Sequence, residues 1–339
     1  MKRLVVLALA AAAIASAQTG PYRILKTVKA GGDGGFDYIY ADPANRKLYI
    51  PRTGTPGRVS VFDLDTLESA GEIADTNARG VAVSAKSGHA FASSKPAAMW
   101  DAKTLAKIKT IDVDGGPDGI MYDGFNDRIW IFSHRAPTAT AINAADGSVA
   151  GTLELGGAPE QAASDGAGHI YVDLEDKDKI AVVDAKTLTV TTTYDLAGQG
   201  GTCAGLAMDV KNRLLFAACR NPKNMVVLNA DTGKIITALP IGAGTDGAVF
   251  NPATMEAFSS QSDGTLTIVK ESSPTSFAVE QTLQTMPGAK TLALDTKTNR
   301  IFVMAAEYGP PPATPAPGGR GPARGAMLSG SFTILAIGK

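Results

Sequence analysis

The chain has 339 residues, with 32 Lys and Arg against 33 Asp and Glu, so its formal net charge is −1. This balance excludes a polycationic arm for nucleic acid and an acidic tail. Charged residues make up only 19%, whereas Gly (37 residues) and Pro (19 residues) are frequent, so many turns and few long surface helices are expected. An apolar share of 44% is enough to bury a full core in a chain of this length.

The N-terminus has the pattern of a signal peptide. Lys2 and Arg3 precede an apolar run over residues 4–14, and Ala15-Ser16-Ala17 forms an A-x-A cleavage site. We expect residues 1–17 to be removed and the protein to be periplasmic or secreted; the alternative is an uncleaved N-terminal anchor. No later stretch approaches 18 apolar residues, so no membrane span is expected. The mature chain would carry 30 bases against 33 acids, which argues against a nucleic-acid partner.

A repeat runs through the whole chain. A short apolar strand that ends in a polar anchor residue recurs seven times, at spacings of 39 to 44 residues. The anchors are Asp42, Ser84, Asp123, Asp165, Asp209, Asn251 and Asp295. A short polar turn and a second strand follow each anchor, and most repeats add a third and a fourth strand before a Gly-rich stretch. Four short strands at this period predict a WD40-like propeller blade.

The ends of the chain predict how the ring closes. The seventh repeat is one strand short, and residues 22–28 match the fourth strands of the other repeats. An N-terminal strand that completes the last blade leaves no exposed inter-blade gap. We therefore predict that residues 18–339 form one all-β domain, a seven-bladed β-propeller with four antiparallel strands per blade, in which the N-terminal strand closes blade seven.

The segment IAVVDAKTLTVTTTYDLAGQGGTCAGLAMDVKNRLLFAAC, residues 180–219, resembles the YVTN-type repeat of YncE-like propellers. The likeness covers essentially the whole mature chain. It implies a propeller fold. Members of this family range from exported binding proteins to heavy chains of quinone- and copper-enzymes, so the resemblance does not fix an activity.

One repeat position, five residues before each anchor, carries most of the candidate site. In blade order it holds Asp37, Arg79, Asp118, Glu160, Ala204, Asp246 and Lys290, of which six are ionisable. Ring closure places Arg79 between Asp37 and Asp118. It places Lys290 between Asp246 and Asp37, whereas Glu160 has no base beside it. The set is either an ion-pair ring that fixes the channel mouth or a polar binding site for a small molecule.

A metal-dependent hydrolase is an alternative interpretation of the same position. Propellers of the regucalcin and gluconolactonase type carry metal-binding acids at a similar place, before Gly and the innermost strand. Asp118, Asp246 and, less closely, Glu160 match that arrangement. Those enzymes have six blades, however, and the two bases of this ring would repel a cation.

Histidines and cofactor motifs are sparse. His134 lies in a predicted top-face loop and is a candidate ligand-binding residue, whereas His89 and His169 fall in turns on the opposite face. Three scattered histidines do not predict a copper or zinc cluster. No C-x-x-C-H motif for haem is present in the sequence. We therefore expect no cofactor and no bound metal.

Two further features concern the predicted top face. Cys203 and Cys219 lie nearly opposite in a predicted hairpin, which indicates a disulfide in an exported protein; two free thiols are the alternative. Residues 309–325 interrupt blade seven with a Pro- and Gly-rich stretch that we expect to form a mobile loop. It is either a tolerated insertion or a lid or partner-docking segment that carries Arg320 and Arg324.

The function favoured by the sequence is that of an exported, non-enzymatic propeller that binds a small molecule or a protein at its top face and channel mouth. A metal-dependent lactonase-like hydrolase and a propeller subunit of a redox complex stay open as alternatives.

Overall fold

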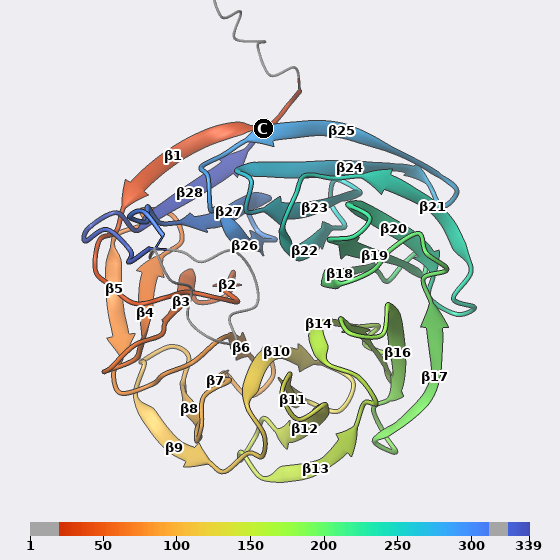
Figure 1. Ribbon diagram of the computed structural model, residues 1–339. Helices are drawn as coiled ribbons and strands as arrows, with labels where there is room; N and C mark the ends of the chain where they lie inside the picture. Colours follow the sequence, from red (N-terminus) through yellow and green to blue (C-terminus); the bar gives the residue numbers. More distant parts are fainter. Residues whose placement is uncertain (1–19, 312–324) are drawn as a thin grey trace, which may run out of the picture.

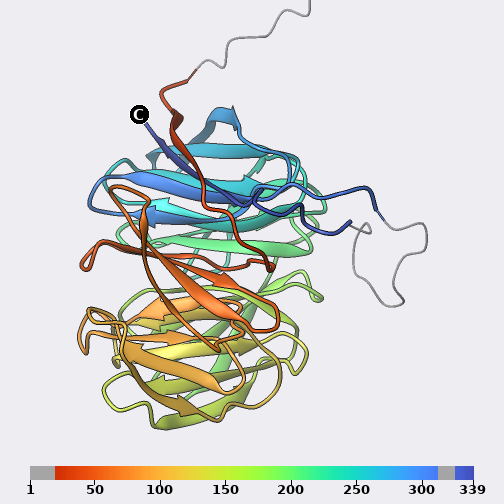
Figure 2. The same cartoon turned by 90° about the vertical axis from the view of Figure 1, so that its left-hand side faces the viewer.

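The computed structural model describes residues 20–311 and 325–339. The predicted signal peptide and residues 312–324 of the Pro- and Gly-rich stretch lie outside the described residues. The described chain forms seven four-stranded antiparallel sheets around a central channel (Figure 1). Seen edge-on, the sheets make one disc (Figure 2). This confirms the predicted all-β, seven-bladed propeller.

Each blade runs from an innermost strand beside the channel to an outermost strand at the rim. Blades 1 to 3 contain β2 (Tyr40–Asp42), β3 (Lys47–Arg52), β4 (Arg58–Asp63), β5 (Ser69–Ile73); β6 (Val81–Val83), β7 (His89–Ala92), β8 (Ala97–Asp101), β9 (Lys107–Ile111); β10 (Pro117–Asp123), β11 (Arg128–Ser133), β12 (Thr138–Asn143) and β13 (Val149–Glu154). Blades 4 and 5 contain β14 (Pro159–Ser164), β15 (His169–Leu174), β16 (Lys179–Asp184), β17 (Thr189–Asp195); β18 (Cys203–Asp209), β19 (Leu214–Cys219), β20 (Asn224–Asn229) and β21 (Ile235–Pro240). Blades 6 and 7 contain β22 (Thr245–Asn251), β23 (Glu256–Gln261), β24 (Thr265–Ser273), β25 (Ser276–Gln284); β26 (Lys290–Asp295), β27 (Arg300–Ala305), β28 (Thr333–Gly338) and β1 (Arg23–Lys29).

The core lies between the blades. Successive side chains of a strand point to opposite faces of its sheet, so a strand buried on both faces is apolar throughout. In β15, Tyr171 packs in the cluster between blades 4 and 5, and Val172 packs in the cluster between blades 3 and 4. Trp100 and Trp130 are fully buried in such clusters. The repeat therefore specifies seven similar interfaces around the ring.

The N-terminal strand closes the ring as predicted. β1 pairs antiparallel with β28, from Arg23 opposite Gly338 to Lys29 opposite Thr333 (Figure 1). The residue before β1, Tyr22, is tied to blade 6: its backbone N–H donates to Gln281 Oε1 at 2.9 Å and its carbonyl accepts from Gln281 Nε2 at 2.8 Å. The first and last strands of the domain thus share the sheet of blade 7, and Tyr22 ties this sheet to blade 6.

The anchor residues connect neighbouring blades on the bottom face, which carries the turns between first and second strands. Asp42 Oδ1 accepts from the backbone N–H groups of Ala44 and Asn45, which fixes its own turn. The guanidinium of Arg46 in blade 1 donates to both carboxylate oxygens of Asp295 in blade 7, at 3.0 and 2.8 Å. The anchors therefore act both as turn residues and as links between blades.

Among the described residues, no helix has the length and apolar character needed to cross a membrane.

Candidate binding site at the channel mouth

The opposite, top face carries the loops into the innermost strands and the loops between second and third strands. A chamber of about 1110 Å³ opens there over blades 2 to 4. Its ionisable lining residues are Arg79, Asp118, His134, Arg135, Asp176 and Lys177. Beneath it, the channel contains a second space of about 430 Å³ between the innermost strands. Of the candidate site residues, Arg79, Asp118 and His134 line the chamber. Glu160 and Asp246 line the space in the channel.

Four residues of the predicted ring form alternating ion pairs. Arg79 Nη1 lies 3.2 Å from Asp37 Oδ2. Lys290 Nζ lies 2.6 Å from Asp246 Oδ2 and 3.7 Å from Asp37 Oδ1. Burial raises the pKa of Asp37 to about 6, an effect that Lys290 opposes and that Asp246 and other acids reinforce. The ion pairs thus offset only part of the cost of burying this carboxylate.

Asp118 is not the second ion-pair partner of Arg79 that the ring order predicted. Within residues 20–311 and 325–339, Asp118 has no ion pair, and its Oδ1 is buried without a hydrogen-bond partner. The reason is one of depth: Arg79 is 51% exposed at the rim of the mouth, whereas Asp118 lies within β10. Burial raises the pKa of Asp118, although Arg79 and His134 oppose this.

Blade 5 contributes a base from a different position. Its ring residue is Ala204, which carries no charge. Arg220, directly after β19, donates from Nη2 to Asp246 Oδ1 and from Nη1 to Glu175 Oε1, both at 2.6 Å. Its Nε donates to the carbonyl of Thr245 at 2.9 Å. Arg220 therefore joins the ring to acids that the sequence analysis did not consider.

His134 lies between two glutamates. Its Nδ1 is 3.3 Å from Glu160 Oε1, and its Nε2 is 3.5 Å from Glu175 Oε2. The Tyr38 hydroxyl donates to the other oxygen of Glu160 at 2.7 Å. The expectation that Glu160 has no base beside it is wrong. The His134 side chain contacts Glu160 from the loop after β11 in the preceding blade.

Glu160 is the most perturbed partly accessible acid of the mouth. Its pKa is raised to about 8, first because the side chain is buried, and then because Glu175, Asp118 and Asp246 are close, whereas the Tyr38 hydrogen bond lowers it. The environment therefore favours a proton, or another positive charge, at this carboxylate. Perturbed carboxylates beside a cavity are a common mark of a functional site.

The acids that the hydrolase alternative would use do not form a metal site together. Asp246 already holds two cations, Lys290 and Arg220, each at 2.6 Å. A carboxylate neutralised twice is a poor ligand for a further cation. The set of Asp118, Glu160 and Asp246 thus does not fit the arrangement expected from the lactonase-type resemblance.

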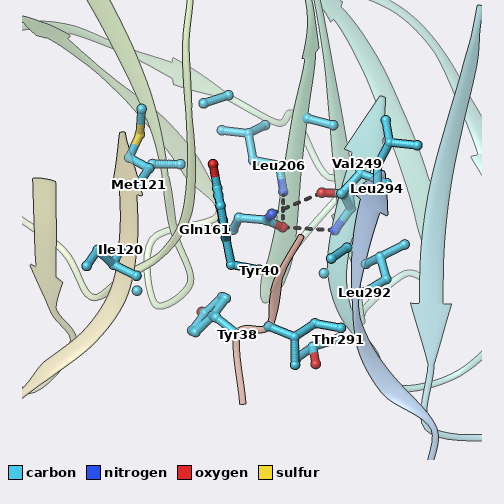
Figure 3. A pocket seen from close by; sticks show the side chains of 18 of the residues that line it. Tyr38, Tyr40, Ile120, Met121, Gln161, Leu206, Val249, Thr291, Leu292 and Leu294 are labelled. Atoms are coloured by element: carbon cyan, nitrogen blue, oxygen red, sulfur yellow. Dashed lines mark hydrogen bonds between the residues drawn. The ribbon is translucent and has the colours of Figure 1, made fainter. Parts of the chain in front are cut away.

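The channel below the mouth is crossed by Gln161 (Figure 3). Its Oε1 accepts from the backbone N–H groups of Leu206 (3.1 Å) and Ala248 (2.8 Å), and its Nε2 donates to the Ala248 carbonyl (2.9 Å). These backbone groups belong to the innermost strands β18 and β22, whose inner edges face the channel. Gln161 therefore joins blade 4 to blades 5 and 6.

Two sequence signals could have identified the residues that were missed. Glu175 and Arg220 directly follow the second strands of blades 4 and 5, the same repeat position as His134 in blade 3. The position after the charged ring is Gly in four blades; the exceptions are Tyr38, Gln161 and Thr291. All three exceptions line the channel (Figure 3).

The two cysteines are joined. Cys203 and Cys219 are opposite each other in the β18–β19 hairpin, and their Sγ atoms form a disulfide. Both side chains are buried between blades 4 and 5, next to the mouth. The bridge holds the top end of the innermost strand of blade 5 to the strand that precedes Arg220.

Comparisons with known proteins identify the fold and not the family. No family model and no curated protein matches the chain. The WD40 repeats of RRP9 superpose with a TM-score of 0.74 at 9% identity, covering 95% of this chain and all of that one. U3-55K superposes with a TM-score of 0.72 at 9% identity, covering 93% of this chain and 98% of that one. A structure of the mitotic checkpoint complex superposes with a TM-score of 0.72 at 12% identity, covering 90% of this chain and 96% of that one. At such identities the likeness shows the fold alone: the chain is a seven-bladed, WD40-like β-propeller, a fold typical of binding and scaffold proteins.

Proposed function

We propose that this chain is an exported, non-enzymatic binding protein of the YncE-like kind whose top-face chamber holds a polar small molecule. The chamber over blades 2 to 4 is the observation that carries the proposal. Its volume of about 1110 Å³ is slightly above the range of about 300–1,000 Å³ that small-molecule sites occupy, so a small molecule fits with room for water. Its charged lining would orient a polar ligand above the ring of ion pairs.

Export is supported by two separate features. The sequence begins with the pattern of a signal peptide, and Cys203 and Cys219 form a disulfide. Disulfides persist in oxidising compartments such as the periplasm and the extracellular space. We therefore propose a periplasmic or secreted location, in which the chamber would face small solutes of that compartment.

A thermal-shift screen tests the binding proposal. The purified protein is incubated with a panel of sugar acids, amino acids and dipeptides, and a ligand of the chamber raises the melting temperature because it stabilises only the folded state. Ala158→Arg places a long side chain in the chamber and is expected to abolish the shift.

The matched control is Ala167→Arg, the same change on the bottom face of the same blade, where the side chain is exposed. It should leave the shift intact. A melting-temperature shift that survives Ala158→Arg would show that the ligand binds elsewhere. Turnover of the ligand by the purified protein would show that the protein is an enzyme and contradict the non-enzymatic part of the proposal.

A further inference from the structure

The side chains of His134, Glu160 and Glu175 converge beneath the chamber from the loop after β11, from β14 and from the loop after β15. One ligand atom of each lies within 4.8 Å of those of the other two. We propose that these three residues bind one divalent transition-metal ion, with zinc as the best-fitting case. The site shares His134 with the lining of the chamber, whereas Glu160 and Glu175 lie outside that lining, and zinc binding can be measured without any ligand in the chamber.

The distance between His134 and Glu175 fits shared coordination better than direct ion pairing. His134 Nε2 lies 3.5 Å from Glu175 Oε2. Two ligand atoms about 2.0–2.1 Å from a tetrahedral zinc ion are about 3.4 Å apart. A charged N–H···O hydrogen bond would bring them to about 2.7–2.9 Å. The imidazole and the carboxylate thus have the spacing of two atoms on one ion.

A neighbouring group holds a second atom of each proposed ligand. Arg220 donates to Oε1 of Glu175, and Oε2 of Glu175 faces Nε2 of His134. Tyr38 donates to Oε2 of Glu160, and Oε1 of Glu160 lies 3.3 Å from His134 Nδ1, the ring nitrogen that does not face Glu175. His134 Nδ1 lies 3.2 Å from the carbonyl of Pro159. A backbone carbonyl on one ring nitrogen and hydrogen bonds to ligating carboxylates are the outer contacts that orient metal ligands.

The charges of the mouth indicate the same ion. The connected cluster contains five carboxylates, Asp37, Asp118, Glu160, Glu175 and Asp246, and three permanently charged bases, Arg79, Arg220 and Lys290. When His134 is neutral and all five carboxylates are ionised, as metal binding requires of its ligands, two negative charges are left over. A divalent cation at Glu160 and Glu175 would neutralise the cluster.

The donor set selects among metals. One imidazole with two carboxylates suits zinc and its first-row neighbours, whereas calcium and magnesium prefer sites built of oxygen alone. Three protein ligands also leave a zinc ion with an open position for water. The three scattered histidines predicted no metal cluster, but this site needs only one histidine.

Titration calorimetry with zinc sulfate on untagged, chelator-treated protein tests the proposal at pH 7.5. We expect one zinc ion per chain, a rise in melting temperature with zinc, and no rise with calcium at the same concentration. Glu175→Gln and His134→Ala should each weaken the zinc Kd by more than about tenfold, which is the least that loss of even an outer contact costs.

His169→Ala is the control, since His169 also lies beside a carboxylate, Asp165, at 2.9 Å, but on the bottom face. It should leave zinc binding unchanged. Metal-free melting curves show whether each variant is folded, and Glu175→Gln preserves the size of the side chain. Absence of stoichiometric binding at micromolar zinc, binding that survives both variants, or binding lost in His169→Ala would each overturn the site.

Discussion

Single residues at the channel mouth show how burial and charge compete. Asp37 is 14% exposed and has Arg79 and Lys290 beside it, yet its pKa is raised to about 6. Ion pairs in a partly buried ring therefore do not restore the solvation that the carboxylate loses. The ring organises the mouth, and Asp37 weakens the fold once it ionises.

A pH dependence follows from Asp37. The folded state binds its proton more tightly than the unfolded state, so the free energy of unfolding falls as pH rises from about 4 to 6. The raised pKa corresponds to a loss on the order of 3 kcal/mol above pH 6. Asp37→Asn, which cannot ionise, should flatten this part of a urea-unfolding series recorded between pH 4 and 7.

Asp33→Asn provides the comparison, because the Asp33 side chain is 89% exposed. Its profile should follow that of the unmodified protein. An unchanged slope in Asp37→Asn would mean that other groups cause the decline.

Strands and turns are connected by polar side chains as well as by packing. Asp295 ends β26, is fully buried, and is held by Arg46 from the neighbouring blade. Although burial alone would raise its pKa, hydrogen bonds from Arg46, Thr298 and Lys297 hold it below the usual value. The link thus keeps a buried carboxylate ionised between two blades.

Removing the base should destabilise the fold strongly. Arg46→Ala leaves Asp295 buried without its bidentate partner, which we expect to lower the free energy of unfolding by roughly 3 kcal/mol. Asp65→Ala removes the exposed partner of the same arginine and should cost less than about 1 kcal/mol. Urea unfolding of both variants measures the difference, and equal losses would contradict the argument.

The repeat predicted the strands and the order of the blades correctly, but it did not predict which charged side chains contact one another. Blade order follows from the period alone, so the neighbours of Lys290 in the ring were read from the sequence. Whether a side chain contacts its neighbour depends on how deep the residue lies in the channel mouth and on the length of the side chain. The period of the repeat predicts neither. Asp118 therefore makes no ion pair with Arg79, and Glu175 and Arg220 reach the mouth from the loops after β15 and β19, which the chosen repeat position does not include.

The whole ring depends on one pairing between its two ends. β1 and β28 complete blade 7, and Tyr22 extends the contact to blade 6 through Gln281. Deletion of residues 20–28 should lower the melting temperature of the entire domain in one transition, because the removed strand leaves β28 as an open edge. A protein that begins at residue 20 is the control. An unchanged melting temperature after the deletion would refute closure by this strand.

The β1–β28 pairing also sets the order in which the ring can be completed. β1 precedes every other strand in the chain, and its partner follows all of them, so it stays without a sheet until synthesis is nearly finished. Closing so long a separation is entropically slow, and an unpaired strand is open to association meanwhile. Three basic residues in β1, Arg23, Lys26 and Lys29, oppose such association. A polypeptide cut short before residue 333 would therefore lose its last strand and release its first.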